Sequence, residues 1–280
     1  MTRGRSNVKL MLSTSSFWFW RQAYDPIENL RIIQDLDLNM DGVDIWLFPD
    51  QEPFRVGKPL RSYICSFNWA SLHTDFYTFD WEEEMRRKDV EEFDKQLRMI
   101  ADVAAELGIG DVVIHSDFLV ANRQKSVALI HRELAGLRVS VEGMDKNKTY
   151  GTHPEHFRDI FSVAHDFGFV PDIAHLLDFS DEYGWEELLL APDLRDRCRF
   201  VHVSLHDAAL SGNFYARQGF NDINAIHAFC IAEEDLLPDG LIAACKEFPM
   251  IIEGIVPPGR RGVELLEMEM EFLRNAGGVL

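Results

Sequence analysis

The stretch that decides the fold is Ala104-Ala-Glu-Leu-Gly-Ile-Gly-Asp-Val-Val-Ile-His115, where a helical pattern runs directly into a buried strand. Apolar residues recur at i, i+3 and i+4 spacing over Asp89–Leu107, which predicts an amphipathic helix that Gly108 ends. Asp111–His115 is a short β-branched run and predicts a strand. A helix followed at once by such a strand is the repeating unit of a parallel α/β fold.

The same alternation continues in both directions along the chain. Strands are predicted over Val8–Ser13, Gly42–Phe48, Ser62–Phe67, Asp111–His115, Arg138–Glu142, Phe169–Ala174, Arg199–Leu205 and Pro249–Glu253. Further helices are predicted to open at Asp25-Pro26 and after Thr152, and to cover Arg123–Leu134, Leu236–Lys246 and Gly262–Asn275. Eight strand–helix units in 280 residues predict a single (β/α)8 TIM barrel domain over residues 1–280. An open nucleotide-binding sheet is disfavoured, because no glycine-rich loop follows the first strand.

Composition and charge indicate which kinds of molecule this protein binds. The chain has 28 basic and 47 acidic residues and a formal charge of −19, which makes nucleic acid an unlikely partner and favours a small-molecule substrate. The four cysteines form no CxxC pair, so we expect reduced thiols and a cytoplasmic location. No apolar stretch approaches the roughly 18 residues that span a membrane. Homo-oligomerisation is left open.

Metal-ligand residue types stand at the ends of five predicted strands. They are His115, Glu142, Asp172 with His175, His202 with His206, and Glu253. In a barrel these ends converge on one mouth. Three carboxylates held together need a compensating charge, and a divalent cation is the simplest one. Carboxylate and imidazole ligands favour Mn, Zn, Co or Fe, with Mg as a further candidate.

Each of these residues also has a plainer interpretation. Glu142 and Glu253 could be solvated strand ends, Asp172 a helix cap, and His115 a histidine at the edge of the core. Residues 202, 204 and 206 share one face of a strand, so at least one of the two histidines there should face the mouth. His73 falls in a loop after the third predicted strand. The remaining histidines, His131, His153, His156, His165 and His227, are assigned no role.

Taken together, these segments resemble the xylose isomerase-like TIM barrels, which include sugar isomerases and epimerases and the endonuclease IV type of AP endonuclease. The resemblance rests on Gly42-Val-Asp-Ile, on the stretch ending in His115, on Val-Ser-Val-Glu142, on Asp172-Ile-Ala-His175, on Val-His-Val-Ser-Leu-His-Asp207, on Gln218-Gly219 with Asp222-Ile223, and on Ile-Ile-Glu253. It implies that Glu142, Asp172, His175 and Glu253 bind metal. It also implies that His73 and His115 match additional histidines of the multi-zinc endonuclease branch.

Two departures from the family pattern stand out. Ser204 occupies the position where the family usually has a strand-seven His or Asp ligand, so either His202 or His206 replaces it or the site is depleted. The Asp-x-His pair that the endonuclease branch uses for a further zinc is absent from Ser211–Asp222. A site with one or two metals is therefore expected.

The resemblance implies a metal-dependent isomerase or epimerase of a small sugar, polyol or hydroxy-carbonyl compound. Glu142 and Glu253 would exchange protons with a metal-held enediolate, and His73, Trp18 and Trp46 would contact the substrate. The first alternative is a metal-dependent phosphodiester hydrolase of the endonuclease IV type, which His73 and His115 favour and the charge opposes. The second is a catalytically depleted barrel that acts as a binding protein.

Overall fold

The computed structural model describes residues 8–20, 24–47, 58–74, 87–119, 123–179, 182, 184–206, 214–220 and 227–276. Eight parallel strands form one sheet in the order β6-β5-β4-β3-β2-β1-β10-β7. They are β1 (Leu10–Ser13), β2 (Gly42–Leu47), β3 (Trp69–Thr74), β4 (Asp111–His115), β5 (Arg138–Glu142), β6 (Gly168–Val170), β7 (Val201–Val203) and β10 (Met250–Ile252). Bridges from Phe169 to Cys198 and from Asp172 to His202 join the two edge strands. The sheet is therefore a nearly closed barrel, and the predicted (β/α)8 fold is confirmed.

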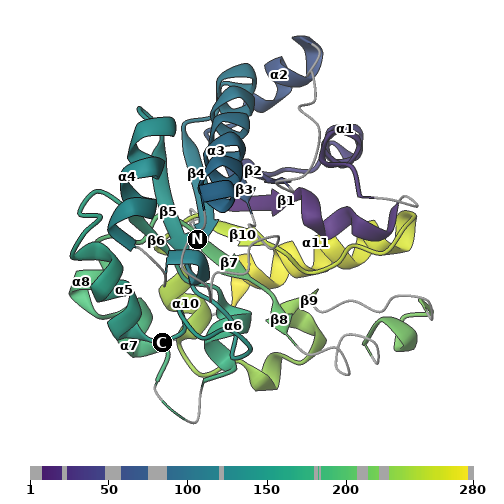
Figure 1. Ribbon diagram of the computed structural model, residues 1–280. Coiled ribbons are helices and arrows are strands. Elements are labelled where there is room, and N and C mark those ends of the chain that lie inside the picture. The colour runs from purple at the N-terminus through teal and green to yellow at the C-terminus, as the bar shows by residue number, and fades with distance from the viewer. Residues whose placement is uncertain are drawn as a thin grey trace.

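Helices surround the strands (Figure 1). The α-helices are α1 (Pro26–Leu36), α2 (Lys58–Ile64), α3 (Arg87–Leu107), α4 (Arg123–Glu133), α5 (Pro154–Phe161), α6 (Ile173–Leu177), α7 (Glu186–Leu189), α8 (Pro192–Arg195), α10 (Leu241–Cys245) and α11 (Arg260–Asn275). Short 3-10 turns are η1 (Thr14–Trp20), η2 (Asp117–Leu119), η3 (Cys230–Ala232) and η4 (Glu234–Leu236), and β8 (Leu205–His206) pairs antiparallel with β9 (His227–Ala228). No helix among the described residues is long and apolar enough to cross a membrane.

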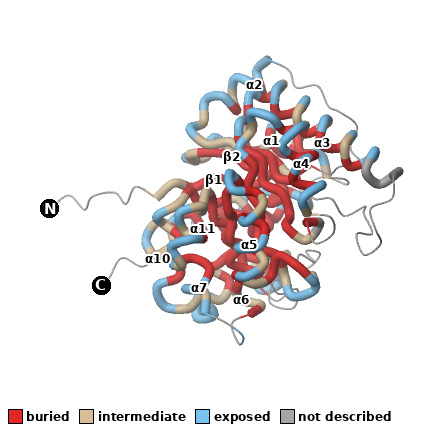
Figure 2. Tube along the Cα trace, turned by 60° about the vertical axis from the view of Figure 1, so that its left-hand side comes forward, coloured by how far each residue is buried: buried red, intermediate tan, exposed pale blue. Residues whose placement is uncertain are grey.

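Alternation along each strand divides the barrel into two packed regions. Outward-facing residues such as Leu12, Val43 and Ile114 pack against the helices in the large hydrophobic core. Met11, Val113, Val170, Phe200 and Ile251 form a small separate cluster. Their neighbours two residues on along the chain include Ser13, His115, Asp172, His202 and Glu253, which therefore lie on the same inner face. Figure 2 shows the buried strands at the centre, with exposed residues on the surrounding helices.

The predicted position of the third strand was wrong. Ser62–Phe67 was expected to be β-structure, but α2 covers Lys58–Ile64 and the strand is Trp69–Thr74. Leu60 and Ile64, four residues apart, are buried on one face of the helix. His73 consequently lies in a strand and not in a loop.

Three other predicted elements differ from the observed ones in where they begin or end, each for a local reason. The sixth strand was expected over Phe169–Ala174 but ends at Val170, because Pro171 has no N–H and Asp172 caps α6. The seventh predicted strand is split between β7 and β8. The helix expected over Leu236–Lys246 is α10 alone, since Pro238 and Gly240, whose φ is 82°, precede it.

Candidate metal centre

Six ionisable side chains from six different parts of the barrel meet at the C-terminal ends of the strands. This group, called the central cluster, consists of His73, His115, Glu142, Asp172, His202 and Glu253. None of the six is more than 6% exposed. Barrel strands bring their C-terminal ends to one mouth, so residues spread over about two thirds of the chain become neighbours.

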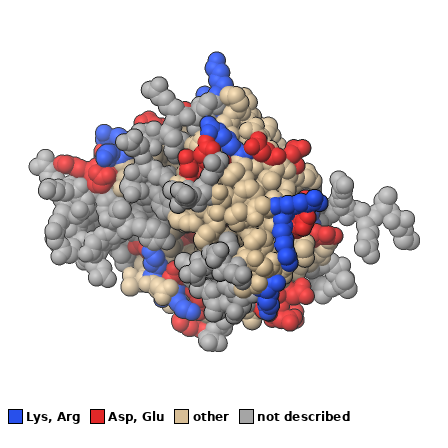
Figure 3. Space-filling view, turned by 90° about the vertical axis from the view of Figure 1, so that its right-hand side faces the viewer, with Lys and Arg blue, Asp and Glu red and all other residues tan. Residues whose placement is uncertain are grey.

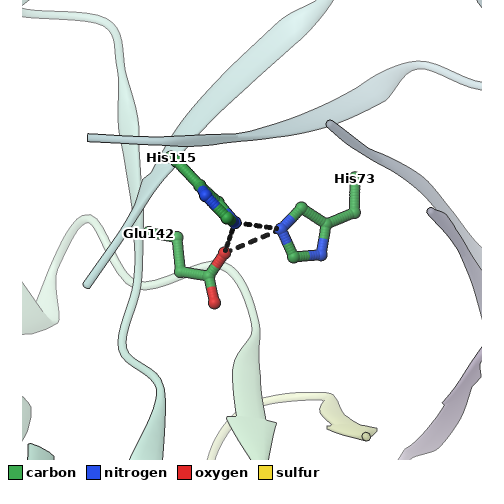
Figure 4. Close-up of side chains that lie close together, drawn as sticks. All are labelled: His73, His115 and Glu142. Atoms are coloured by element: carbon green, nitrogen blue, oxygen red, sulfur yellow. Dashed lines mark hydrogen bonds and ion pairs between the residues drawn. The ribbon is translucent and has the colours of Figure 1, made fainter. Parts of the chain in front are cut away.

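Glu142 lies at the middle of the central cluster. Its Oε2 is 2.8 Å from His73 Nε2 and 3.3 Å from His115 Nε2, and those two nitrogens are 3.1 Å apart. Figure 4 shows the three side chains pointing toward one another from separate strands. The other oxygen, Oε1, is 2.8 Å from His202 Nδ1. The two oxygens of one carboxylate therefore face two different sets of imidazoles.

Glu253 and Asp172 complete the second side of the central cluster. Glu253 Oε2 is 3.4 Å from His202 Nδ1, and its Oε1 is 3.7 Å from His73 Nδ1. Asp172 Oδ1 accepts hydrogen bonds from the backbone N–H groups of Ala174 and His175 at the start of α6. Its Oδ2 is buried without a hydrogen-bond partner. Asp172 is thus both the predicted helix cap and a member of the central cluster.

The pKa values of Glu142 and His73 show how strongly the two charges depend on each other. Burial tends to raise the pKa of Glu142, but the neighbouring charges of His202 and His73 hold it well below its ordinary value. Burial tends to lower the pKa of His73, yet the charge of Glu142 holds it well above its ordinary value. Glu142 is therefore a carboxylate that positive charge stabilises.

The other carboxylates differ from each other. Burial raises the pKa of Glu253, but the charge of His202 and the nearby imidazole of His73 lower it to about 2. His202 has a pKa of about 9, because Glu253 and Glu142 outweigh its burial. Burial, together with the negative charges of Glu253 and Glu142, raises the pKa of Asp172 to about 7 despite the opposing charge of His175. The imidazoles thus stabilise Glu142 and Glu253 as anions but do not offset the burial of Asp172.

The donor set fits a divalent transition metal. Three groups have ligand atoms that all lie within 4.8 Å of one another: His73, His115 and Glu142; His73, His202 and Glu253; and Glu142, Asp172, His202 and Glu253. The orphaned Oδ2 of Asp172 and Nε2 of His202 are buried atoms that a cation would satisfy. Mixed imidazole and carboxylate ligands suit zinc, iron, manganese or cobalt.

Of the residues predicted on strand seven, His202 lies in the central cluster. Ser204 stands where the family usually has a His or Asp ligand. It is fully buried, and its Oγ is 2.8 Å from His227 Nδ1. The backbone of His206 lies in β8, while its side chain is outside the described residues, as is Asp207 of the same motif. Among the two histidines considered for this position, the structure brings His202 into the central cluster.

His175 lies beside the central cluster and not within it. Its Nδ1 is 2.7 Å from the carbonyl oxygen of Gly143 and 3.4 Å from Asp172 Oδ2. Its ring lies 6.2 Å from that of His227. The sequence analysis assigned no role to His227. Its position in β9 depends on a long-range antiparallel pairing that leaves no local pattern.

The aromatic residues predicted to contact substrate adjoin the central cluster. The Trp46 ring stacks on His73 at 5.8 Å between centroids. Trp18, which is 38% exposed, stacks on Tyr24 at 4.9 Å and lies 6.0 Å from Trp46. These rings form a continuous wall from His73 toward solvent.

Asp44 is a buried acid that the sequence analysis did not assign. It is fully buried in β2, accepts hydrogen bonds from Ser13 and Ser71, and has an oxygen 3.7 Å from His73 Nδ1. One signal could have identified it: Asp44 is a lone acid within the apolar strand Gly42-Val-Asp-Ile-Trp46.

Basic residues on the described surface are mostly paired with acids. Examples are Arg98 with Asp94 and Glu133, Arg138 with Asp111, and Lys148 with Asp117. On the face in Figure 3, Lys and Arg lie among Asp and Glu and form no uniform basic stripe. The described surface therefore gives no support for a backbone-phosphate track.

Comparisons with known proteins identify the fold. No protein-family model and no curated protein sequence matches this chain. Endonuclease IV from Thermus thermophilus superposes with a TM-score of 0.59 at 16% identity, covering 96% of this chain and 100% of that chain. D-allulose 3-epimerase from Methylomonas sp., in complex with D-allulose, gives 0.57 at 16% identity over 89% and 84%.

A xylose isomerase domain protein from Planctomyces limnophilus gives a TM-score of 0.53 at 11% identity, covering 96% of this chain and 97% of that chain. These neighbours include both classes of enzyme that the sequence suggested. At such identities they establish the architecture and not the reaction. The chain has the fold of the xylose isomerase-like TIM barrels.

Proposed function

We propose that this protein is a metal-dependent hydrolase that cleaves a phosphate ester bond in a small molecule, using two divalent ions. The observation that carries the proposal is the position of Glu142. One oxygen faces His73 and His115, and the other faces His202 beside Glu253. A carboxylate between two sets of donors is the arrangement expected of a ligand shared by two ions.

Each residue of the central cluster has a role under this proposal. His73, His115 and Glu142 would hold one ion, while Glu142, Asp172, His202 and Glu253 would hold the other. Bound divalent ions supply Lewis acidity and lower the pKa of water, which phosphate ester hydrolysis requires. The wall of Trp18, Tyr24 and Trp46 would exclude water and orient an apolar or ring-shaped part of the substrate.

The substrate is proposed to be small because of charge. A polymeric nucleic acid is bound mainly through Lys and Arg that neutralise phosphates. This chain carries a formal charge of −19, and its described basic residues are largely neutralised by acids. A small phosphate ester needs only the ions and the adjoining wall.

The test is elemental analysis of the purified chain together with assays on three substrate classes: a small phosphate diester, a polymer and a ketose. We expect about two transition-metal ions per chain after reconstitution with zinc, manganese or iron, and hydrolysis of bis(4-nitrophenyl) phosphate. Abasic-site DNA serves as the polymer substrate and should be cleaved more slowly. Failure to bind any metal under these conditions would contradict the proposal and favour a barrel that only binds ligands.

A second candidate is the sugar or polyol epimerase. The observation that favours it is the placement of Glu142 and Glu253, whose oxygens both lie near His202 Nδ1, at 2.8 and 3.4 Å. Two carboxylates around one donor could accept and return a proton on opposite sides of a substrate held on one ion. About one ion per chain, with ketose epimerisation and no phosphate ester cleavage, would support this candidate instead.

A further inference from the structure

We infer that Asp44 is the residue that positions His73, holding the imidazole with Nδ1–H toward Asp44 so that Nε2 faces the central cluster. The inference rests on the proposed function, because it concerns how one expected ligand is oriented. Neither the sequence analysis nor the comparisons assign a role to Asp44.

The hydrogen bonds of Asp44 are all accepted ones. Ser71 Oγ donates to Oδ1 at 2.6 Å, and Ser13 Oγ donates to Oδ2 at 3.2 Å. The direction of the second bond follows from Ser15, whose backbone N–H and hydroxyl both donate to Ser13 Oγ. Because Ser13 accepts these two bonds, its own hydrogen is available for Asp44. The Ser15–Ser13–Asp44 chain therefore ends on a carboxylate acceptor.

Strand register explains why this carboxylate is next to His73. Ser13 pairs with Asp44, and Asp44 pairs with Ser71, across β1, β2 and β3. His73 lies two residues beyond Ser71 on the same strand and so on the same inner face. The row of Ser13, Asp44 and Ser71 thus forms a polar layer immediately below His73.

The two ring nitrogens of His73 face different surroundings. Nε2 is 2.8 Å from Glu142 Oε2 and 3.1 Å from His115 Nε2, whereas Nδ1 is buried without a hydrogen bond. Asp44 Oδ2 and Glu253 Oε1 are each 3.7 Å from Nδ1. A movement of about 0.7 Å would bring either oxygen to ordinary hydrogen-bond length.

Asp44 is the better partner for Nδ1–H. Glu253 also faces His202 at 3.4 Å and belongs to two of the candidate ligand groups, while Asp44 belongs to none of them. A histidine that binds metal through one nitrogen usually donates its other N–H to a carboxylate or carbonyl, which fixes the tautomer and the ring orientation. Asp44 provides that acceptor from a strand that contributes no ligand.

The first test needs no variant of Asp44. In zinc-loaded protein labelled with ¹⁵N-histidine, long-range ¹H–¹⁵N NMR spectra should report His73 with its proton on Nδ1, the signals being assigned by their loss in His73→Gln. A proton on Nε2 of His73 would overturn the inference, whatever the effect of substitutions.

The second test measures zinc affinity by competition with a chelator. Asp44→Asn should weaken binding by roughly 10-fold to 100-fold, as loss of a ligand's partner does. Ser71→Ala is the matched control, since it removes the bond to Oδ1 but leaves Oδ2 beside His73. Equal affinity in Asp44→Asn and wild type would overturn the inference while leaving the proposed function intact. Failure of the wild type to bind zinc would reject both.

Discussion

Two carboxylates of the central cluster and one in α11 are all buried, but their pKa values shift in opposite directions. In the central cluster, Glu142 and Glu253 keep pKa values below their ordinary range, because charged imidazoles outweigh their burial. In α11, Glu269 is fully buried and accepts hydrogen bonds from the backbone N–H groups of Cys230 and Ile231. Burial raises its pKa from 4.5 to about 7, although those bonds lower it.

The opposite pKa shifts distinguish Glu269, a buried acid with a structural role, from Glu142 and Glu253, which their surroundings keep ionised. Two backbone N–H groups satisfy the hydrogen bonds of Glu269 but do not compensate for the loss of water around a charge. The central cluster instead surrounds its acids with imidazoles. It still leaves Asp172 with a pKa of about 7 and one oxygen that accepts no hydrogen bond. A cation would satisfy the buried Asp172 Oδ2 and His202 Nε2 of the central cluster, whereas both oxygens of Glu269 already accept hydrogen bonds.

The largest expected effect comes from Glu142→Gln. An amide cannot serve as a bridging anion between two sets of donors, so we expect the metal content to fall in both sets and catalytic activity to drop by more than about 100-fold. Elemental analysis and turnover of bis(4-nitrophenyl) phosphate measure the two effects. Ser140→Ala is the control, because Ser140 is a buried residue of the same strand that has no described contact with the central cluster. Unchanged metal content in Glu142→Gln would contradict the shared-ligand assignment.

His202→Ala and His206→Ala form the next pair. His202 contacts Glu142 and Glu253 and belongs to two candidate ligand groups, so its loss should lower metal occupancy by about tenfold or more. His206→Ala should leave the metal content close to that of wild type. If both variants kept the metal occupancy of wild type, neither histidine would replace the family ligand at the Ser204 position.

Metal removal should have an intermediate effect on stability. A metal present at about 100 times its Kd stabilises the folded state by roughly 2.7 kcal/mol, and its removal should lower Tm by roughly 5–10 °C. Thermal unfolding with and without a chelator measures the difference. The same treatment of Glu142→Gln should change Tm much less. An equal shift in both proteins would place the stabilising ion elsewhere.

The smallest effect should appear at Glu269 and depend on pH. Because its folded pKa is raised, Glu269 favours folding at low pH, and that contribution is lost as pH rises from 4.5 to about 7. Glu269→Gln lacks this titration, so its stability relative to wild type should rise by roughly 1–3 kcal/mol over that interval. Denaturant unfolding at pH 5 and pH 8 tests this. Glu271→Gln, at an exposed position on the same helix, should show no such trend.

The fold could be predicted where local pattern and tertiary environment agree. β4 and β5 were predicted to the residue, because they are apolar runs that end in a single ionisable side chain. The helices α3 and α1 also matched closely, the latter through its Asp25 cap and Pro26. β3 was misplaced because Ser71 and His73 face a polar interior, so Trp69–Thr74 does not resemble an ordinary buried strand.

Most residues of the candidate site could be predicted from the sequence, but the residues that each of them contacts could not. His202 and His206 had equal claims in the sequence, since both lie on the same strand face. The structure brings His202 into the central cluster, while the side chain of His206 lies outside the described residues. His227 and Asp44 were given no role, because the contacts that make them important are with neighbours that are distant in the chain.

The sequence by itself determined the alternation of strands and helices, the position of acids and imidazoles at strand ends, and the charge that disfavours a polymeric anion. These properties depend on residue type and short-range period, which the chain displays directly. Only the tertiary structure decided that Glu142 faces two sets of donors and that Asp44 lies under His73. Those relations follow from strand register and barrel closure, which fix distances between residues that are far apart in the chain.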